Sequence, residues 1–209
     1  MEISDLSCKD FISALGSAQP APGGGGAAAL VGAVGMALGH MVGSFTVGKK
    51  KYAGVEEEIT ALNIQAESLE KELLALIEAD KQAFLPLSKA YGLPSVTAEE
   101  KAKKDRVMEI CLKDAAKVPF AILQLTGQAL ELLAAYAAKG SAIMISDAGC
   151  GAACCKAALQ AAALNVLINT KSMKEADYAE QLNKETDALL VKYMALADRI
   201  YTDVTAKCR

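Results

Sequence analysis

The sequence predicts an all-α protein, a bundle of five to six mostly long helices, and two observations carry this prediction. The 209 residues are 53% hydrophobic but only 5% aromatic, with no Trp, so the apolar mass is mainly Ala, Leu, Val and Ile, and Ala and Leu are strong helix formers. Nowhere do apolar and polar residues alternate with the period of two that is typical of a strand. Because no linker or change in composition divides the chain, we expect one helical domain over residues 1–209.

The N-terminal part predicts a short helix, a turn and an apolar helix. The short helix covers residues 5–15, and Pro20 and Pro22 make the following segment turn-like because proline prevents regular helix there. The glycine run after Pro22 opens an apolar helix that ends near residue 47. Lysines 49–51 follow, where the carbonyl end of a helix favours cations.

The remaining helices are set by caps and breakers. A long helix covers residues 56–90. Thr97 and Glu100 form a capping box that starts the next helix, which runs towards Lys139 and carries Pro119, a residue that should kink or break it. We expect an Ala-rich helix that ends near residue 170 and an amphipathic helix over residues 175–206.

Charge and cysteine content exclude several classes of protein. The net charge of −3 and the pI of about 5.3 argue against a nucleic-acid-binding protein, which would need a clustered basic excess. The acidic N-terminus lacks the apolar core of a secretory signal, so we expect a cytoplasmic protein with free thiols. Cys150, Cys154 and Cys155 do not have the usual spacing of zinc ligands, and we predict no metal site. His40, the one histidine, is interpreted as a core residue with a satisfied hydrogen bond.

An uncharged stretch over residues 27–47 raises the question of a membrane helix. Gly35, Gly39 and Gly43 recur every four residues, as in transmembrane dimers. Nine of the 21 residues are Ala or Gly and no Trp or Tyr anchors flank the stretch, so we interpret it as a closely packed helix of a soluble protein. This helix and the Ala-rich one are apolar nearly all round, which favours burial in a homodimer.

Asp80 is the first candidate for catalysis. Apolar residues spaced three and four apart place one face of the expected helix in the core (Leu73, Leu76, Ile77, Phe84 and Leu87), and Asp80 falls on this face. A carboxylate there is costly unless it is paired, hydrogen-bonded or protonated. Burial would raise its pKa towards the range that suits a general acid or base. A purely structural role in helix packing is the alternative.

Asp147 is the second buried-carboxylate candidate, since it is the only charged residue between residues 140 and 155. A capping role for Ser146 or Asp147 at a helix N-terminus is the alternative. Asn165 and Asn169 lie one helical turn apart further along. At ~1.5 Å per residue, Asp147 and Asn165 are about 27 Å apart along one helix. They cannot reach one reacting atom in a single subunit, so we interpret the asparagines as structural or interfacial.

The glycine run has two interpretations on its own. Exposed backbone N–H groups before a helix can bind an anion or a carbonyl oxygen, and glycines also permit close helix packing. The run is neither a Walker loop nor a Rossmann fingerprint. Lysines 49–51 end the helix that the glycines begin, about 36 Å away. Loop and lysines could therefore meet only across a dimer interface or at two ends of a long ligand.

Several motifs in order make the sequence resemble the cyclodeaminase/cyclohydrolase family of folate enzymes. They are Pro20-Ala-Pro-Gly-Gly-Gly-Gly-Ala-Ala-Ala, Met41-Val42, Gly48-Lys-Lys-Lys-Tyr52, Asp80-Lys-Gln-Ala-Phe84, Val118-Pro119, Ser146-Asp147 and Asn165-Val-Leu-Ile-Asn169. The chain departs from the family pattern at Gly26, where Ser is usual, at His40, where small residues are common, and at Ser141, where Asn is common. These departures bear on substrate preference more than on class.

The resemblance implies an all-helical dimer that acts on a tetrahydrofolate derivative without a metal or redox cofactor. It implies Asp80 as catalytic acid/base. It also implies three groups of substrate-binding residues. They are the glycine run with the proline before it (Pro22, Gly23, Gly24 and Gly25), the lysines after the apolar helix (Lys49 and Lys50), and the pair Ser146 and Asp147. We predict a methenyltetrahydrofolate cyclohydrolase. The alternatives are a formiminotetrahydrofolate cyclodeaminase that releases ammonia, a non-catalytic folate-binding helical dimer and a membrane-helix protein.

Overall fold

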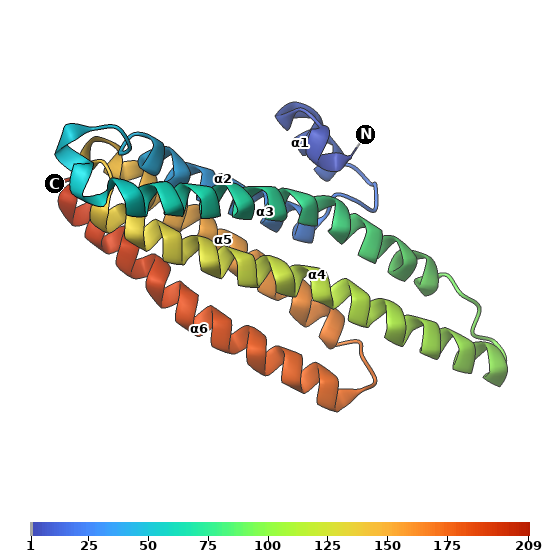
Figure 1. Cartoon of the computed structure of the whole chain (residues 1–209). Coiled ribbons are helices and arrows are strands. Elements are labelled where there is room, and N and C mark those ends of the chain that lie inside the picture. The colour runs from blue at the N-terminus through green and yellow to red at the C-terminus, as the bar shows by residue number, and fades with distance from the viewer. Residues whose placement is uncertain (1) are drawn as a thin grey trace.

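The computed structural model describes residues 2–209, and within this range it contains six α-helices, three short 3₁₀-helices and no strand. The helices are α1 (Cys8–Leu15), α2 (Gly24–Ser44), α3 (Glu56–Tyr91), α4 (Ala98–Lys139), α5 (Ile145–Thr170) and α6 (Ala176–Lys207), and the 3₁₀-helices are η1 (Ile3–Asp5), η2 (Lys50–Val55) and η3 (Ala142–Met144). The all-α prediction is confirmed. The five long helices run side by side, and α1 is set apart from them (Figure 1).

Most predicted helices are found with similar ends. The capping box is confirmed, since the Thr97 hydroxyl accepts from the Glu100 N–H at 3.1 Å and the Glu100 carboxylate accepts from the Thr97 N–H at 2.9 Å. The predicted first helix is instead divided into η1 and α1. Of the two outcomes expected at Pro119, a kink or a break, the break does not occur, because α4 continues through Pro119 to Lys139.

Helix α2 lies among α3, α4 and α5, and its glycines allow the close approach. An added Cβ at Gly35 would lie 2.9 Å from the Gly151 carbonyl oxygen of α5, and one at Gly151 would lie 2.6 Å from that of Gly35. Ordinary contacts are longer, at about 3.5 Å, so the two backbones touch where the helices cross. Thr46 near the end of α2 accepts a hydrogen bond from Ser141, just before α5, at 2.8 Å. Helices α2 and α5 are therefore antiparallel.

Three helices are long and apolar enough to cross a membrane by length and composition alone, namely Gly24–Ser44, Ala98–Lys139 and Ala142–Thr170. About half of each apolar window is buried inside the fold. Apolar side chains nevertheless remain exposed on the outer faces of α2 and α5, with exposed fractions of 46% for Val34, 67% for Leu164 and 61% for Ile168.

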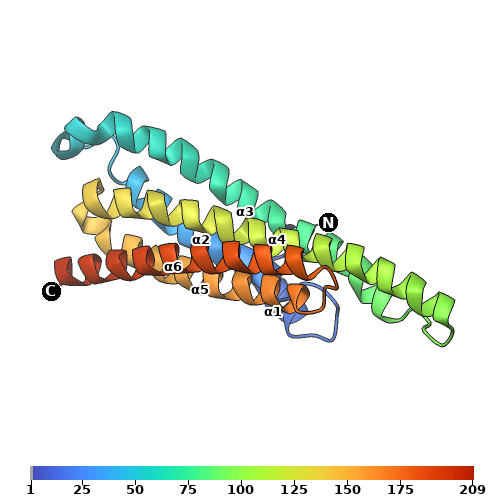
Figure 2. The same cartoon turned by 90° about the horizontal axis from the view of Figure 1, so that it is seen from below.

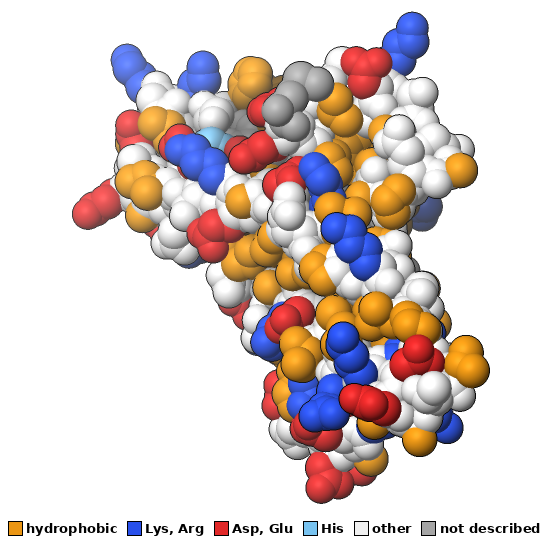
Figure 3. All heavy atoms as spheres, turned by 90° about the vertical axis from the view of Figure 1, so that its right-hand side faces the viewer, with side chains coloured by type: hydrophobic (Ala, Val, Ile, Leu, Met, Phe, Trp, Pro, Cys, Tyr) orange, Lys and Arg blue, Asp and Glu red, His pale blue; other side chains and the backbone are white. Residues whose placement is uncertain are grey.

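Helices α3 and α4 extend beyond the other helices as a pair (Figures 1 and 2). A small second core holds this pair together, with Leu87, Leu112 and Ala115 buried in it. Viewed from the end that carries the α3–α4 and α5–α6 turns, the surface mixes charges of both signs with apolar side chains (Figure 3).

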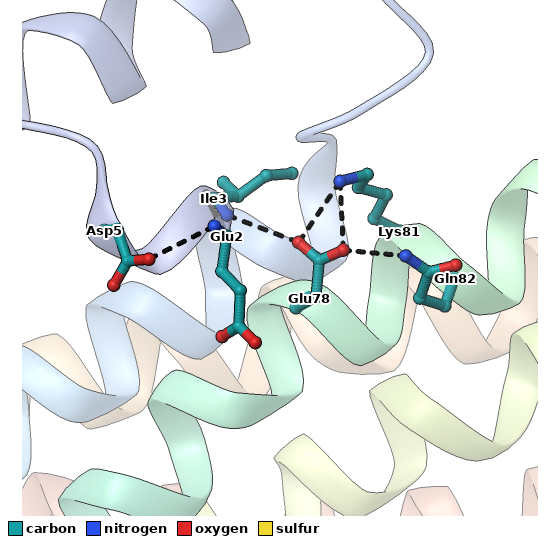
Figure 4. Close-up of polar contacts among 6 residues, drawn as sticks. All are labelled: Glu2, Ile3, Asp5, Glu78, Lys81 and Gln82. Atoms are coloured by element: carbon teal, nitrogen blue, oxygen red, sulfur yellow. Dashed lines mark hydrogen bonds and ion pairs between the residues drawn. The ribbon is translucent and has the colours of Figure 1, made fainter.

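The N-terminal segment is anchored to α3 just before Asp80. Glu78 accepts the Ile3 N–H at 3.3 Å, and Lys81 and Gln82 donate to the same carboxylate at 2.9 and 2.7 Å (Figure 4). Phe11 of α1 is only 4% exposed and packs in the main core. These contacts hold the N-terminal segment, which leads into the glycine run, against the helix bundle at Ile3 and at Phe11.

Candidate active site

A cavity of about 170 Å³ lies where the start of α2 meets the middle of α3 and α4 and the end of α5. Its lining residues are Pro20, Ala21, Gly23, Gly24, Gly25, Asp80, Phe84, Ala115, Pro119, Asn165, Ile168 and Asn169. The walls are mostly apolar, and the side chains of one carboxylate and two amides face the interior. This is the composition expected of a small-molecule site.

Asp80 is half-buried on the apolar face of α3, as predicted from the spacing of its neighbours. Leu73, Ile77 and Leu87 on that face are 1% exposed or less. The Gly26 N–H of α2 donates to Asp80 Oδ2 at 3.0 Å. Asp80 thus satisfies one of the N–H groups that the first turn of α2 leaves without a helical partner. Its other oxygen, Oδ1, receives no hydrogen bond from residues 2–209 and lies against Gly25, which lines the cavity together with Asp80.

Burial raises the pKa of Asp80 above the usual aspartate range, and the hydrogen bond from Gly26, which favours the charged form, offsets only part of this effect. Two opposing causes are thus built into one side chain. The result is a carboxyl group that can exchange a proton closer to neutral pH, which is the property required of a general acid or base.

The need for glycine at positions 24 and 25 is explained by the side chains that pack against the backbone there. An added Cβ at Gly25 would lie 2.6 Å from Asp80 Cγ, and one at Gly24 would lie 2.9 Å from Asn165 Nδ2. Neither position has room for a side chain. The loop therefore allows a carboxylate from α3 and an amide from α5 to lie directly on its backbone.

The structure divides the predicted substrate-binding residues into two groups. Gly23, Gly24 and Gly25 line the cavity with Asp80, whereas Pro22 is buried behind the loop against Gly26. The second group lies at the far end of α2 and the start of α5, and comprises Lys49, Lys50, Ser146 and Asp147. Helix α2 has 21 residues, so the groups are about 30 Å apart in one chain.

A hydrogen bond joins two segments at the far group, η2 and the short η3 just before α5. The Ala142 N–H donates to the Tyr52 hydroxyl at 2.9 Å. Helix α5 begins at Ile145, and its N-cap, Met144, makes no side-chain cap. Ser146 and Asp147 lie inside the first turn, so the capping alternative for them is wrong.

The interpretation of Asn165 and Asn169 as structural or interfacial does not account for their position, because both line the cavity that holds Asp80. Asp147 and both asparagines lie on the single helix α5, as the estimate from helix length assumed. The order of the helices could have placed these asparagines beside the glycine run, because helices joined by short loops alternate in direction. The end of α5 must then lie beside the start of α2.

His40 pairs with Glu70 of α3 through Nδ1 and Oε1 at 2.9 Å, and both side chains are about one quarter exposed. It does not line the cavity and has a hydrogen-bond partner as predicted, but it lies at the partly exposed edge of the bundle and not in the core. No group of three or more His, Cys, Asp or Glu side chains that could hold a metal ion occurs among residues 2–209.

Comparison with known proteins defines the class. The family model described as formiminotransferase-cyclodeaminase matches residues 7–188. A methenyltetrahydrofolate cyclohydrolase from Methylorubrum extorquens is 41% identical over 94% of this chain and 95% of that protein. A formiminotetrahydrofolate cyclodeaminase from Thermotoga maritima has a solved structure that matches with a TM-score of 0.81 at 30% identity, over 99% of this chain and 97% of that one.

The chain therefore belongs to the formiminotransferase-cyclodeaminase family of folate cyclohydrolases and cyclodeaminases. It spans about a third of the formimidoyltransferase-cyclodeaminase of Mus musculus, to which it is 30% identical over 89% of its own length. The resemblance in the sequence is thus confirmed. This is a family of soluble enzymes.

Proposed function

We propose that the protein hydrolyses 5,10-methenyltetrahydrofolate to 10-formyltetrahydrofolate in the cytoplasm, with Asp80 as general acid and base. The observation that carries the proposal is the half-buried Asp80 carboxyl, whose pKa is raised by burial and which lines a mostly apolar cavity. The cyclohydrolase from Methylorubrum extorquens, 41% identical over nearly its whole length, supports this reaction over others in the family.

The proposed reaction begins with attack on the cationic bridge carbon. Asp80 accepts a proton from water as the water oxygen bonds to this carbon, which lies between N5 and N10, and a neutral hydroxylated intermediate forms. The protonated carboxyl then donates to N5 as the bond from the carbon to N5 breaks. The hydroxyl proton leaves to solvent and the formyl group stays on N10, so the turnover releases one proton. A carboxylate beside the cation also stabilises it electrostatically.

A loss of methenyltetrahydrofolate absorbance on adding the purified protein tests this function. We expect Asp80→Asn to abolish the loss while the far-UV circular dichroism keeps its helical shape, because the amide oxygen of the introduced side chain can still accept from Gly26. Glu72→Gln, which replaces an exposed carboxylate on the same helix, is the matched control and should turn over normally. Unchanged turnover in Asp80→Asn would remove this residue from the mechanism.

The cyclodeaminase reaction is the second candidate, since the matching structure from Thermotoga maritima carries that description. There Asp80 would donate a proton to the departing nitrogen. Incubation with formiminotetrahydrofolate and measurement of ammonia separates the two activities. Binding of both folates without turnover of either would instead leave a non-catalytic folate-binding protein.

We further propose a homodimer formed by the outer faces of α2 and α5. The exposed or half-exposed residues there are uncharged and mostly apolar, with Gln160 of α5 as a polar exception. The apolar ones include Val31, Val34, Leu38, Phe45, Ala153, Ala157, Leu164 and Ile168. An antiparallel arrangement of the two α2 helices would carry the lysine end of one chain towards the cavity of the other. A contact of this kind explains how two groups ~30 Å apart along α2 could serve one folate.

Light scattering in detergent-free buffer tests the dimer. We expect twice the chain mass of 21.8 kDa, and a monomer for Val34→Glu, which places a charge in the apolar face. The matched control is Val191→Glu on α6, where the side chain is 75% exposed. A wild-type monomer would refute the dimer, and insolubility without detergent would favour a membrane protein.

A further inference from the structure

The cavity contains two amide side chains that the proposed reaction does not use. Asn165 and Asn169 lie one turn apart on α5, both half-buried, and both line the cavity with Asp80. Each Nδ2 group donates to a backbone carbonyl of the protein. Neither Oδ1 receives a hydrogen bond from residues 2–209, so the cavity holds two amide oxygens that are free to accept.

The orientation of the Asn169 amide is fixed by a proline on α4. Pro119 has no N–H, so it leaves the carbonyl of Ala115, four residues earlier, without its helical donor. Asn169 Nδ2 donates to this carbonyl at 3.2 Å and to the Asn165 carbonyl at 2.8 Å. Turning the amide over would place Oδ1 against two carbonyl oxygens, which repel it. Its oxygen is therefore held as an acceptor.

Asn165 is held by its own helix and by the glycine loop. Its Nδ2 donates to the Ala161 carbonyl at 2.8 Å, and the amide lies where a Cβ at position 24 would be. Gly24 is next to Gly25, against which Asp80 lies, and consecutive Cα atoms are about 3.8 Å apart. The amide and the carboxyl thus meet the same short stretch of loop backbone.

The size and polarity of the cavity suit a ligand with one ring system and several hydrogen-bond donors along one edge. Its volume of about 170 Å³ is below the ~300–1,000 Å³ that buries a whole drug-sized ligand. Phe84, Pro119 and Ile168 offer apolar walls. The polar side chains, by contrast, present mainly acceptors, namely the two amide oxygens and Asp80 Oδ1. A reduced pterin carries adjacent N–H donors on the 2-amino group and the pyrimidine ring.

We propose that Asn165 and Asn169 accept hydrogen bonds from the 2-amino group at the donor edge of the substrate's pterin ring and so place the bridge carbon at Asp80. This proposal rests on the proposed function, because it names the part of a tetrahydrofolate that the cavity receives. The rest of the folate then extends out of the cavity. Asn169 also completes the backbone hydrogen bonding that Pro119 interrupts, whereas Asn165 makes only an intrahelical bond, so Asn165 is the cleaner residue to replace.

The test compares two ligands that need no turnover. Calorimetry measures binding of 5-formyltetrahydrofolate and of its 2-desamino-2-methyl analogue, in which a methyl group replaces the 2-amino donor. Wild-type protein should prefer the parent by roughly three- to tenfold for each hydrogen bond to the 2-amino group, the range for a neutral hydrogen bond. Asn165→Ala should weaken binding of the parent by that factor and leave binding of the analogue unchanged. Asn169→Ala should behave in the same way if it folds.

Asn183→Ala is the matched control, since Asn183 is a half-buried asparagine on α6 that accepts from Thr170 at 2.7 Å outside the cavity. It should leave binding of both ligands as in wild type. The proposal is overturned if Asn165→Ala binds the parent as tightly as wild type, or if it loses both ligands equally. Absence of methenyltetrahydrofolate turnover in wild type would overturn the proposed function instead, and the ligand comparison would still report on the asparagines.

Discussion

Replacement of Gly25 by Ala tests whether the loop exists to seat the Asp80 carboxyl. The new Cβ would overlap Asp80 Oδ1, its nearest neighbour, and would lie 2.6 Å from Cγ and 2.7 Å from Oδ2, at least about 1 Å short of an ordinary contact. The carboxyl must therefore move by about that distance, which breaks its 3.0 Å hydrogen bond with Gly26. Loss of a hydrogen bond to a charged group costs about 1.5–3 kcal/mol, and the helical preference of Ala over Gly offsets about 0.5–1 kcal/mol.

We expect Gly25→Ala to lower the free energy of unfolding by about 1–2 kcal/mol, the difference between these terms, as measured by urea denaturation. Turnover of methenyltetrahydrofolate should fall about 10²–10⁴-fold, the usual contribution of a positioned acid or base. Gly23→Ala is the control from the same loop, because its Cβ would meet nothing within 4 Å. A Gly25→Ala protein with wild-type stability and turnover would refute the reasoning.

Three further predictions concern single buried polar groups. Because burial raises the pKa of Asp80, ionisation of this group costs stability in the folded state. Asp80→Asn should therefore raise the melting temperature at neutral pH, and the gain should shrink as pH falls through the folded-state pKa. Wild-type kcat/KM should fall with acid over the same range, and an acid limb at the usual aspartate pKa would contradict this. Thr126→Val should leave the free energy of unfolding in urea unchanged or raise it by up to about 1 kcal/mol, because the buried Thr126 hydroxyl has no hydrogen-bond partner within residues 2–209. A decrease of more than about 1 kcal/mol would show that this hydroxyl is hydrogen-bonded in the folded protein. Tyr136→Phe should cost about 0.5–1.5 kcal/mol, because the fully buried Tyr136 hydroxyl donates to Asn63 at 2.8 Å, and an unchanged denaturation midpoint would dismiss that bond.

The fold is predictable because its signals are local. Composition and the absence of a two-residue period predict helices, and the pairing of Thr97 with Glu100 marks the start of α4 within a residue. The position of Asp80 on an apolar face follows from spacing alone. These features depend on residues within a few turns of one another, so a sequence is enough to find them.

The course of α4 through Pro119 depends on a residue far along the chain. Proline removes a donor wherever it lies in a helix, so a kink or break is the sound local expectation. Asn169, 54 residues from Ala115, supplies the missing donor. Only the packing of α5 on α4 brings it there, and no pattern near residue 119 reveals it.

Which residues belong to the site is predictable only in part, because this depends on the direction in which α5 packs against α2. Both Asp147 and Asn165 are candidates on one helix, and their separation excludes a shared reacting atom in one chain. The structure brings Asn165 to Asp80 and leaves Asp147 beside the lysine end of α2.

The residues that form the cavity also complete the backbone around it. Asp80 Oδ2 satisfies the start of α2 and Asn169 Nδ2 satisfies the gap at Pro119. Each of these side chains lines the cavity, uses one polar atom for structure and leaves its other polar atom without a hydrogen bond from residues 2–209. For Asp80 this leaves one oxygen, Oδ1, to exchange a proton with the substrate. A single carboxylate oxygen suffices for the proposed hydrolysis, because the proton taken from water and the proton given to N5 pass at successive steps.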